Sequence, residues 1–146
     1  MQTCSIYFRT GSILIVSESQ TEEGGPYYGI GPMFKVESLT PLQIGRAILN
    51  ALSASRNDIP DPADFKALQQ RLLQFLGVQR WGQVARTFKY AGVERDESIV
   101  TITPHRVGQA ASFVPDGEPT QCQQTDVECI GRGVLSALKI KDLPRE

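Results

Sequence analysis

Apolar residues that are mostly aromatic or β-branched recur between polar ones in two neighbouring segments, 87–94 and 98–104, and this pattern predicts a pair of β-strands. In the second segment Val100 and Ile102 point to one side of the chain, and the residues between them point to the other. A period of two residues is the pattern of a strand with one buried face. Residues 95–97 between the segments are all charged, as expected of a short exposed turn. The two segments therefore predict a β-hairpin.

Two residues mark the limits of this hairpin. Trp81 is the single tryptophan of the chain and lies in a short helical segment just before the first strand. Its large ring is expected to be buried between this helix and the sheet. Pro104 lacks a backbone N–H, so it is expected to end the second strand or to lie at a sheet edge.

Further strands are predicted before and after the hairpin. Segments 5–9 and 12–17 are rich in apolar residues and are joined by a tight turn at Gly11. Segments 27–30 and 33–36 indicate one strand that is interrupted at Gly31 and Pro32. Most of 107–121 is expected to be loop, with a short edge strand at 112–114.

Three main helices are predicted from capping signals and apolar periodicity. Thr40 followed by Pro41 predicts a helix start, because threonine caps free N–H groups and proline suits the first turn. This helix is expected to end near residue 54. Asp61 followed by Pro62 repeats the signal before a second helix that reaches Gly77.

The third helix is predicted by the capping box 125–128 and ends near Leu138. Its sequence IGRGVLSAL is similar to the sequence IGRAILNAL in the first helix. The flanking residues do not repeat at this offset, which argues against an internal duplication. We expect instead that both helices lie on the same sheet, and that Gly45 and Gly131 allow close approach.

The order of elements is strand–strand–strand, helix–helix, strand–strand, helix. Two of the connections, the turn at Gly11 and the turn at 95–97, are too short to join parallel strands. They indicate an antiparallel sheet. The expected fold is a single α+β domain over 1–146. It has a mostly antiparallel twisted sheet of about five to six strands and about three main helices packed chiefly on one face.

The amino-acid composition argues against some classes of function. Of 146 residues, 40% are apolar and 21% are charged, which is typical of a globular chain. The net charge of −1 gives no basic surface for nucleic acid, so no direct nucleic-acid partner is expected. The apolar run 13–16 is too short to span a membrane, and the first residues do not resemble a secretory leader.

The cysteines favour a cytoplasmic protein. Cys4, Cys122 and Cys129 are an odd number and contain no C-x-x-C pair. We therefore expect reduced thiols rather than a disulfide framework.

No catalytic residue, cofactor site or metal site is predicted. His105 is the only histidine and has no nucleophile motif near it, so a solvent-facing position at a strand end is expected. His105 and the three cysteines could in principle bind zinc. However, zinc sites usually contain ligands that are close together in sequence, and no such pair occurs here, so a zinc site is not expected. The glycine-rich loop 24–31 lacks the G-x-x-x-x-G-K-[ST] pattern and no helix follows it directly.

Residues 18–28 are the strongest candidate for binding a partner protein. They hold three glutamates and no basic residue, next to two tyrosines that offer rigid contact area. The alternative is an ordinary solvated loop. The candidate contacts are therefore Glu18, Glu22, Glu23, Tyr27 and Tyr28. The charged hairpin turn adds Arg95, Asp96 and Glu97.

Four stretches of the sequence also resemble a known family. TGSILIVSES, EEGGPYYGIGPMFKV, LGVQRWGQVART and SIVTITP are similar to segments of immunity proteins of bacterial contact-dependent growth inhibition. The likeness extends from about Gly11 to Val114, and its motifs are structural rather than catalytic. It implies a protein that binds and blocks one toxin domain, the C-terminal region of a large exported surface protein and often a nuclease. It also implies that in some relatives a toxin segment adds to a sheet edge.

Two other classes stay open at this stage. A small enzyme or nucleotide-binding regulator would use the loop 24–31 and His105. A generic oligomerisation module would need neither. Sequence does not decide the oligomeric state.

Overall fold

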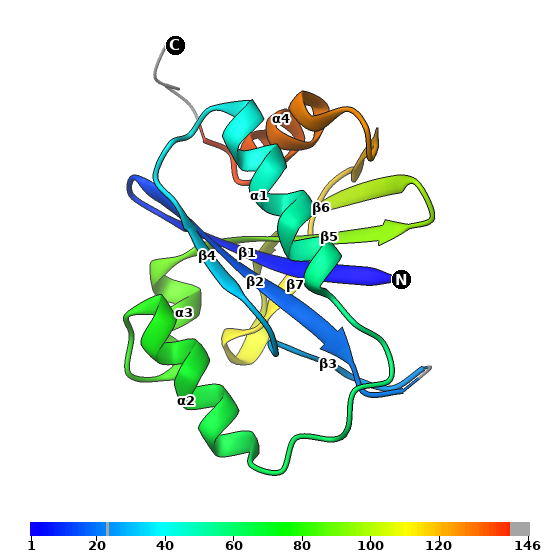
Figure 1. The fold of residues 1–146 in the computed structure, drawn as a ribbon. Helices are drawn as coiled ribbons and strands as arrows, with labels where there is room; N and C mark the ends of the chain where they lie inside the picture. Colours follow the sequence, from blue (N-terminus) through cyan, green and yellow to red (C-terminus); the bar gives the residue numbers. More distant parts are fainter. Residues whose placement is uncertain (23, 141–146) are drawn as a thin grey trace.

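The computed structural model describes residues 1–22 and 24–140, and these form one curled antiparallel sheet of eight strands with helices on both faces (Figure 1). The strand order is β3-β2-β1-β5-β6-β7, with β4 also paired to β2 and β8 also paired to β6. The strands are β1 (Gln2–Arg9), β2 (Ser12–Gln20), β3 (Tyr27–Tyr28), β4 (Met33–Val36), β5 (Lys89–Asp96), β6 (Ile99–Val107), β7 (Phe113–Pro115) and β8 (Thr120–Gln123). The helices are α1 (Pro41–Ala54), α2 (Phe65–Leu76), α3 (Trp81–Thr87) and α4 (Val127–Ala137), with one 3-10 turn at Gln109–Ala111.

Each face of the sheet carries its own apolar cluster. Side chains alternate between faces along a strand, so Ile6, Ile13 and Ile15 pack with α1 and α4. Their neighbours Tyr7 and Leu14 pack on the other face with α2 and α3. In Figure 1, α1 and α4 lie above the sheet, and α2 and α3 lie below it at the left.

The predicted α+β fold with a mostly antiparallel sheet is confirmed, and four details differ. Residues 27–36 divide into two strands, and 120–123 add a strand in a segment expected to be loop. The edge strand expected at 112–114 forms one residue later, as β7. The expectation of helices on one face holds for α1 and α4, whereas α2 and α3 lie on the opposite face.

The similar sequences of the first and last helices reflect the contact of these helices with each other. A Cβ at Gly45 would lie 2.1 Å from the carbonyl oxygen of Val127. A Cβ at Gly131 would lie 1.9 Å from that of Pro41. Both helices lie on one sheet face, as expected, and the two glycines let the first turn of each approach the other.

The helix starts agree only in part with the predicted caps. Thr40 accepts from the backbone N–H of Gln43, as predicted, at 3.4 Å. The second helix is capped by Asp64 rather than Asp61, and the Asp64 carboxylate accepts from Ala67 N at 3.0 Å. Gly77 ends this helix in the left-handed region at φ 74°, which suits glycine.

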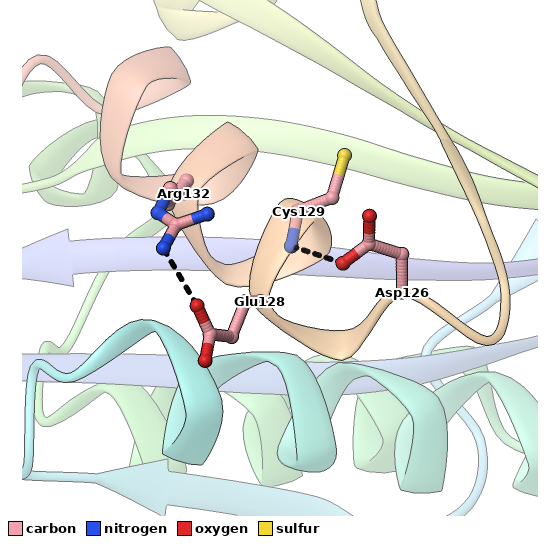
Figure 2. A network of polar contacts seen from close by, with 4 residues as sticks. All are labelled: Asp126, Glu128, Cys129 and Arg132. Carbon is pink, nitrogen blue, oxygen red and sulfur yellow. Dashed lines mark hydrogen bonds and ion pairs between the residues drawn. The ribbon is translucent and has the colours of Figure 1, made fainter.

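The last helix begins one residue later than the predicted capping box. Asp126, not Thr125, is its N-cap and accepts from Cys129 N at 3.2 Å (Figure 2). Aspartate is at least as good an N-cap as threonine, and this shift frees Glu128. Its carboxylate then forms an ion pair with Arg132, one turn further on, at 2.6 Å (Figure 2).

The hairpin is confirmed, but its turn is tighter than predicted. The strands continue through Asp96, and the two turn residues are Glu97, at φ 55°, and Ser98. Pro104 does not end β6: it pairs with Ala91, and the strand continues to Val107. Pro104 is tolerated because it serves as an acceptor, and its carbonyl receives the N–H of Asp116 at 2.8 Å.

The expectation of reduced thiols is wrong for two cysteines. Cys122 at the end of β8 and Cys129 in the first turn of α4 form a disulfide, with their Cα atoms 5.9 Å apart. The turn between β8 and α4 folds the chain back, so a spacing of seven residues suffices without a C-x-x-C pair. Cys4 is free and buried, and burial raises the pKa of its thiol. A buried thiol of raised pKa is unreactive.

Candidate functional site

On the sheet face that carries α2 and α3, one half is polar. This half is formed by the start of β1 and by the ends of β2 and β5. Strand register places Glu18, Thr3, Glu94 and Thr101 side by side in one row across β2, β1, β5 and β6. The next row contains Ser5, Gly92 and Thr103. Acidic and hydroxyl side chains from four strands therefore meet on one surface.

Two hollows lie along this row. The first, of about 260 Å³, is lined by residues that include Glu18, Glu94, Thr3 and His105. The second, of about 410 Å³, lies at the tip of the hairpin, where Glu94 also contributes to its wall. Its other carboxylates come from Asp96 and Glu97. We call Glu18, Glu94, Asp96 and Glu97 the acidic face. The hairpin that carries three of them projects to the right in Figure 1, away from α2 and α3.

Glu18 is the electrostatically unusual member of the acidic face. Burial raises the pKa of its carboxyl, and the nearby hydroxyls of Ser5 and Thr3 offset part of that rise. No Lys, Arg or His of the described residues forms an ion pair with it, since the two ion pairs found there are Lys35–Glu37 and Glu128–Arg132. A buried carboxylate without a cation is costly.

This pKa shift predicts a pH-dependent stability. The folded carboxyl holds its proton to higher pH than the unfolded one, so its favourable contribution is complete at low pH and is lost as pH rises through the raised pKa. Glu18→Gln should therefore unfold like the wild type near about pH 4 and become the more stable protein towards about pH 7. Thermal unfolding at both pH values measures this. A variant that is less stable than the wild type at neutral pH would contradict it.

Burial also governs the tyrosines behind the acidic face. The Tyr90 hydroxyl and Ser5 Oγ are 2.6 Å apart. Burial raises the pKa of Tyr90 and of Tyr7, so both hydroxyls stay protonated at neutral pH. The Tyr7 and Tyr90 rings contact each other edge to face, with their centroids 5.1 Å apart.

An aromatic groove lies on the other side of Tyr27. Its volume is about 350 Å³, and Tyr27, Tyr28, Phe65, Leu68 and Trp81 are among the residues that line it. The Tyr28 and Phe65 rings are 5.4 Å apart between centroids. Phe65 is 54% exposed, which is unusual for a large apolar side chain. The groove therefore adds apolar contact area beside the acidic face.

The expected burial of Trp81 is only partly met. It packs against the cluster of Leu76, Val84 and Phe88, but it is half-buried and one side of it lines the groove. We therefore expect Trp81→Ala to cost about 2 kcal/mol, below the roughly 3–5 kcal/mol of a fully buried aromatic. Denaturant unfolding measures this. A loss above about 4 kcal/mol would show that the ring is essential to the core.

The glycine-rich loop 24–31 has the wrong polarity for a phosphate cradle. Arg71 of α2 donates to the carbonyl oxygens of Gly29 and Gly31, at 3.3 and 2.5 Å. Carbonyl oxygens repel phosphate, whereas a phosphate site needs converging N–H groups. The loop leads into β4 rather than a helix. Its role is to join β3 to β4 and to hold α2 against them.

His105 lies within β6 rather than at a strand end. Its ring is half-buried, contacts Tyr90 edge to face at 4.8 Å between centroids, and its Nδ1 is 2.9 Å from the carbonyl of Thr103. The expectation of a solvent-facing position is therefore wrong, because β6 continues past Pro104. Within residues 1–22 and 24–140, no group of three His, Cys, Asp or Glu side chains is placed to hold a metal ion.

The structure separates the residues proposed as partner contacts. Glu18 and Asp96 both belong to the acidic face but line different hollows, and Glu97 lies at its end. Tyr27 lies beside them and donates to the Met1 carbonyl at 3.4 Å. Burial, together with the charges of Glu94 and Glu18, raises its pKa.

The remaining candidates lie elsewhere. Tyr28 faces Phe65 of α2. Glu22 is exposed in the turn after β2, and Glu23 lies outside the described residues. Arg95 points to the α1 side, where its Nε donates to Gln2 Oε1 at 2.7 Å. It belongs to β5, not to the turn, so its side chain points away from those of Glu94 and Asp96.

Sequence reasoning missed Glu94, which lines both hollows, and Thr3. The alternation of Gly92, Glu94 and Asp96 along β5 was a usable signal, since it places two carboxylates on one face. No local pattern indicated Thr3.

Comparison with known proteins supports the fold alone. No protein-family model matches the chain, and no curated protein matches it. A solved protein of unknown function from Neisseria meningitidis superposes with a TM-score of 0.75 at 17% identity, covering 94% of this chain and 93% of that one. A chain of the CdiA-CT/CdiI toxin and immunity complex from Yersinia pseudotuberculosis superposes with a TM-score of 0.69 at 15% identity. That match covers 93% of this chain and 96% of the other.

Among the described residues, no helix has both the length and the apolar character needed to cross a bilayer.

Proposed function

We propose that this protein is a cytoplasmic immunity protein that binds and blocks a toxin domain of contact-dependent growth inhibition. The observation that carries the proposal is the acidic face, where Glu18, Glu94 and Asp96 line two neighbouring hollows and form no ion pair with any described Lys, Arg or His. The likeness to a chain of a toxin and immunity complex supports it through the fold.

The chemistry of the acidic face fits a basic protein. A nuclease holds phosphates on a basic surface, and opposite fields steer two proteins together and reject wrong partners. We infer that the partner is a nuclease domain at the C-terminus of a large exported surface protein. The aromatic groove would supply contact area next to the charges, as rigid aromatic side chains do at interfaces.

Protection of cells tests this proposal. The toxin is the C-terminal domain encoded by the adjacent gene for a large exported protein, and it is expressed from an inducible promoter with or without this protein. Restored growth is the expected result. Continued growth arrest while soluble protein accumulates, or an adjacent gene of metabolic function, would contradict it.

The enzyme alternative is tested at His105. Because its ring packs on Tyr90 and its Nδ1 bonds to a backbone carbonyl, we expect His105→Ala to keep full protection of cells against the toxin. Growth assays measure this, with thermal unfolding as the control for folding. A folded variant that no longer protects would favour catalysis through His105.

A further inference from the structure

We propose that the hollow beside Glu18 is a socket for one arginine side chain of the toxin. The inference rests on the proposed function, because the partner is the toxin of that proposal. It goes further by naming the chemical group that this part of the acidic face recognises.

The shape of the hollow suits a single side chain. Its volume is about 260 Å³, and it opens between β2, β1, β5 and β6, which supply Glu18, Thr3, Glu94 and Thr103 to its lining. Gly92 lines the hollow without a side chain, and the His105 ring lies beside it: a Cβ at Gly92 would lie 3.2 Å from His105 Cε1.

The hollow presents acceptors that lack a cationic partner. Thr3 Oγ1 is buried and forms no hydrogen bond of good geometry with any of the described residues. It lies beside the Glu18 carboxylate and offsets part of the rise in its pKa. Glu94 stands on the far side of Thr3 in the same row. Native proteins rarely leave a buried polar atom unsatisfied, so these groups indicate a ligand that brings N–H donors and positive charge.

A guanidinium matches this arrangement better than the other cations. It carries five N–H donors in a plane, whereas the lysine ammonium is a compact point charge. The acceptors here come from three neighbouring strands rather than from one point, so a planar group can reach several at once. A metal ion would need clustered ligands, and the described residues offer no group of three. The arginine therefore pairs with Glu18 and donates to Thr3 Oγ1.

The socket is tested first on the protein alone. Methylguanidinium chloride is titrated into 15N-labelled protein at constant ionic strength and followed by NMR. Saturable shifts of the Thr3, Gly92 and Glu94 amides are expected, with weaker shifts from methylammonium. Both should be lost in Glu18→Gln, which removes the charge and keeps the shape. Absent shifts, shifts retained in Glu18→Gln or equal responses to both cations would overturn the assignment.

The toxin complex provides the second test. Glu18→Gln should weaken binding to the toxin domain at least about tenfold, mainly through faster dissociation, because a charged hydrogen bond is lost. Glu37→Gln is the matched control, since Glu37 is exposed between β4 and α1, outside the hollow, and it should bind as the wild type does. Equal affinities of the two variants would overturn the socket. Absence of toxin binding by the wild type would instead reject the proposed function, and the methylguanidinium titration would still decide the socket.

Discussion

Gly131→Ala is expected to lower the free energy of unfolding by about 3 kcal/mol or more, towards the upper end of the cost of overpacking. The added Cβ would lie 1.9 Å from the Pro41 carbonyl oxygen and 2.5 Å from the Pro41 Cα. Both are backbone atoms, so no side chain can rotate to make room. The change forces α4 away from α1, and apolar contact between each helix and the sheet is lost with it. Urea unfolding of both proteins measures the difference.

Gly82→Ala is the matched control for this effect. Gly82 lies in α3, and nothing lies within 4 Å of the Cβ that alanine would add. Alanine is the better helix former by roughly 0.5–1 kcal/mol, so this variant should be as stable as the wild type or slightly more stable. A loss below about 1 kcal/mol for Gly131→Ala would show that the helix pair adapts and that the glycine is not required.

Reversing the charge of the acidic face should have the largest effect on binding. Glu94 and Asp96 lie on one side of β5, and Thr3 of β1 lies between Glu94 and Glu18 in the same row. We expect Glu94→Lys with Asp96→Lys to slow association with the toxin about tenfold or more at low salt, because electrostatic steering is reversed. The difference should shrink at high salt, since exposed charges are screened over about 10 Å at 0.1 M. Surface-binding kinetics at two salt concentrations measure this.

The control for charge reversal uses two glutamates far from that face. Glu37 lies between β4 and α1, and Glu128 lies on α4, across the sheet. Glu37→Lys with Glu128→Lys changes the net charge by the same amount and should leave association near the wild-type rate. Equal slowing by both double variants would mean that net charge matters rather than this surface.

The pair Glu22 and Glu23, which the sequence indicated as candidate contacts, provides a further comparison. Glu22 is exposed beyond the end of β2, so reversing Glu22 and Glu23 tests whether the turn belongs to the same interface. Slowing by that pair alone would place the partner at the turn rather than on the acidic face.

The parts of the fold that depend on local sequence could be predicted. The alternation around Val100 and Ile102, the cap at Thr40 and the end of α2 at Gly77 are each determined by a few neighbouring residues, and all are confirmed. The alternative caps show the limit of such signals. Asp64 and Asp126 each lie within three residues of the cap that was predicted, Asp61 and Thr125 respectively, and only the packed helix decides between them.

The candidate site could not be predicted, because it depends on strand register. Glu18, Thr3 and Glu94 are distant in sequence and become neighbours only through the pairing of β2, β1 and β5. The position of the hairpin turn also determines which side chains lie on the acidic face. A turn at Glu97 and Ser98, instead of 95–97, places Arg95 and Asp96 in a strand and on opposite faces. The disulfide between Cys122 and Cys129 similarly depends on how β8 turns into α4.

The most direct test of the central claim is the affinity of the purified protein for the purified toxin domain, measured by titration calorimetry. We expect a one-to-one complex with a Kd tighter than about 1 µM, and we expect Glu94→Lys with Asp96→Lys to weaken this complex while Glu37→Lys with Glu128→Lys does not. Absence of binding at micromolar concentrations, or equal binding by both double variants, would contradict it.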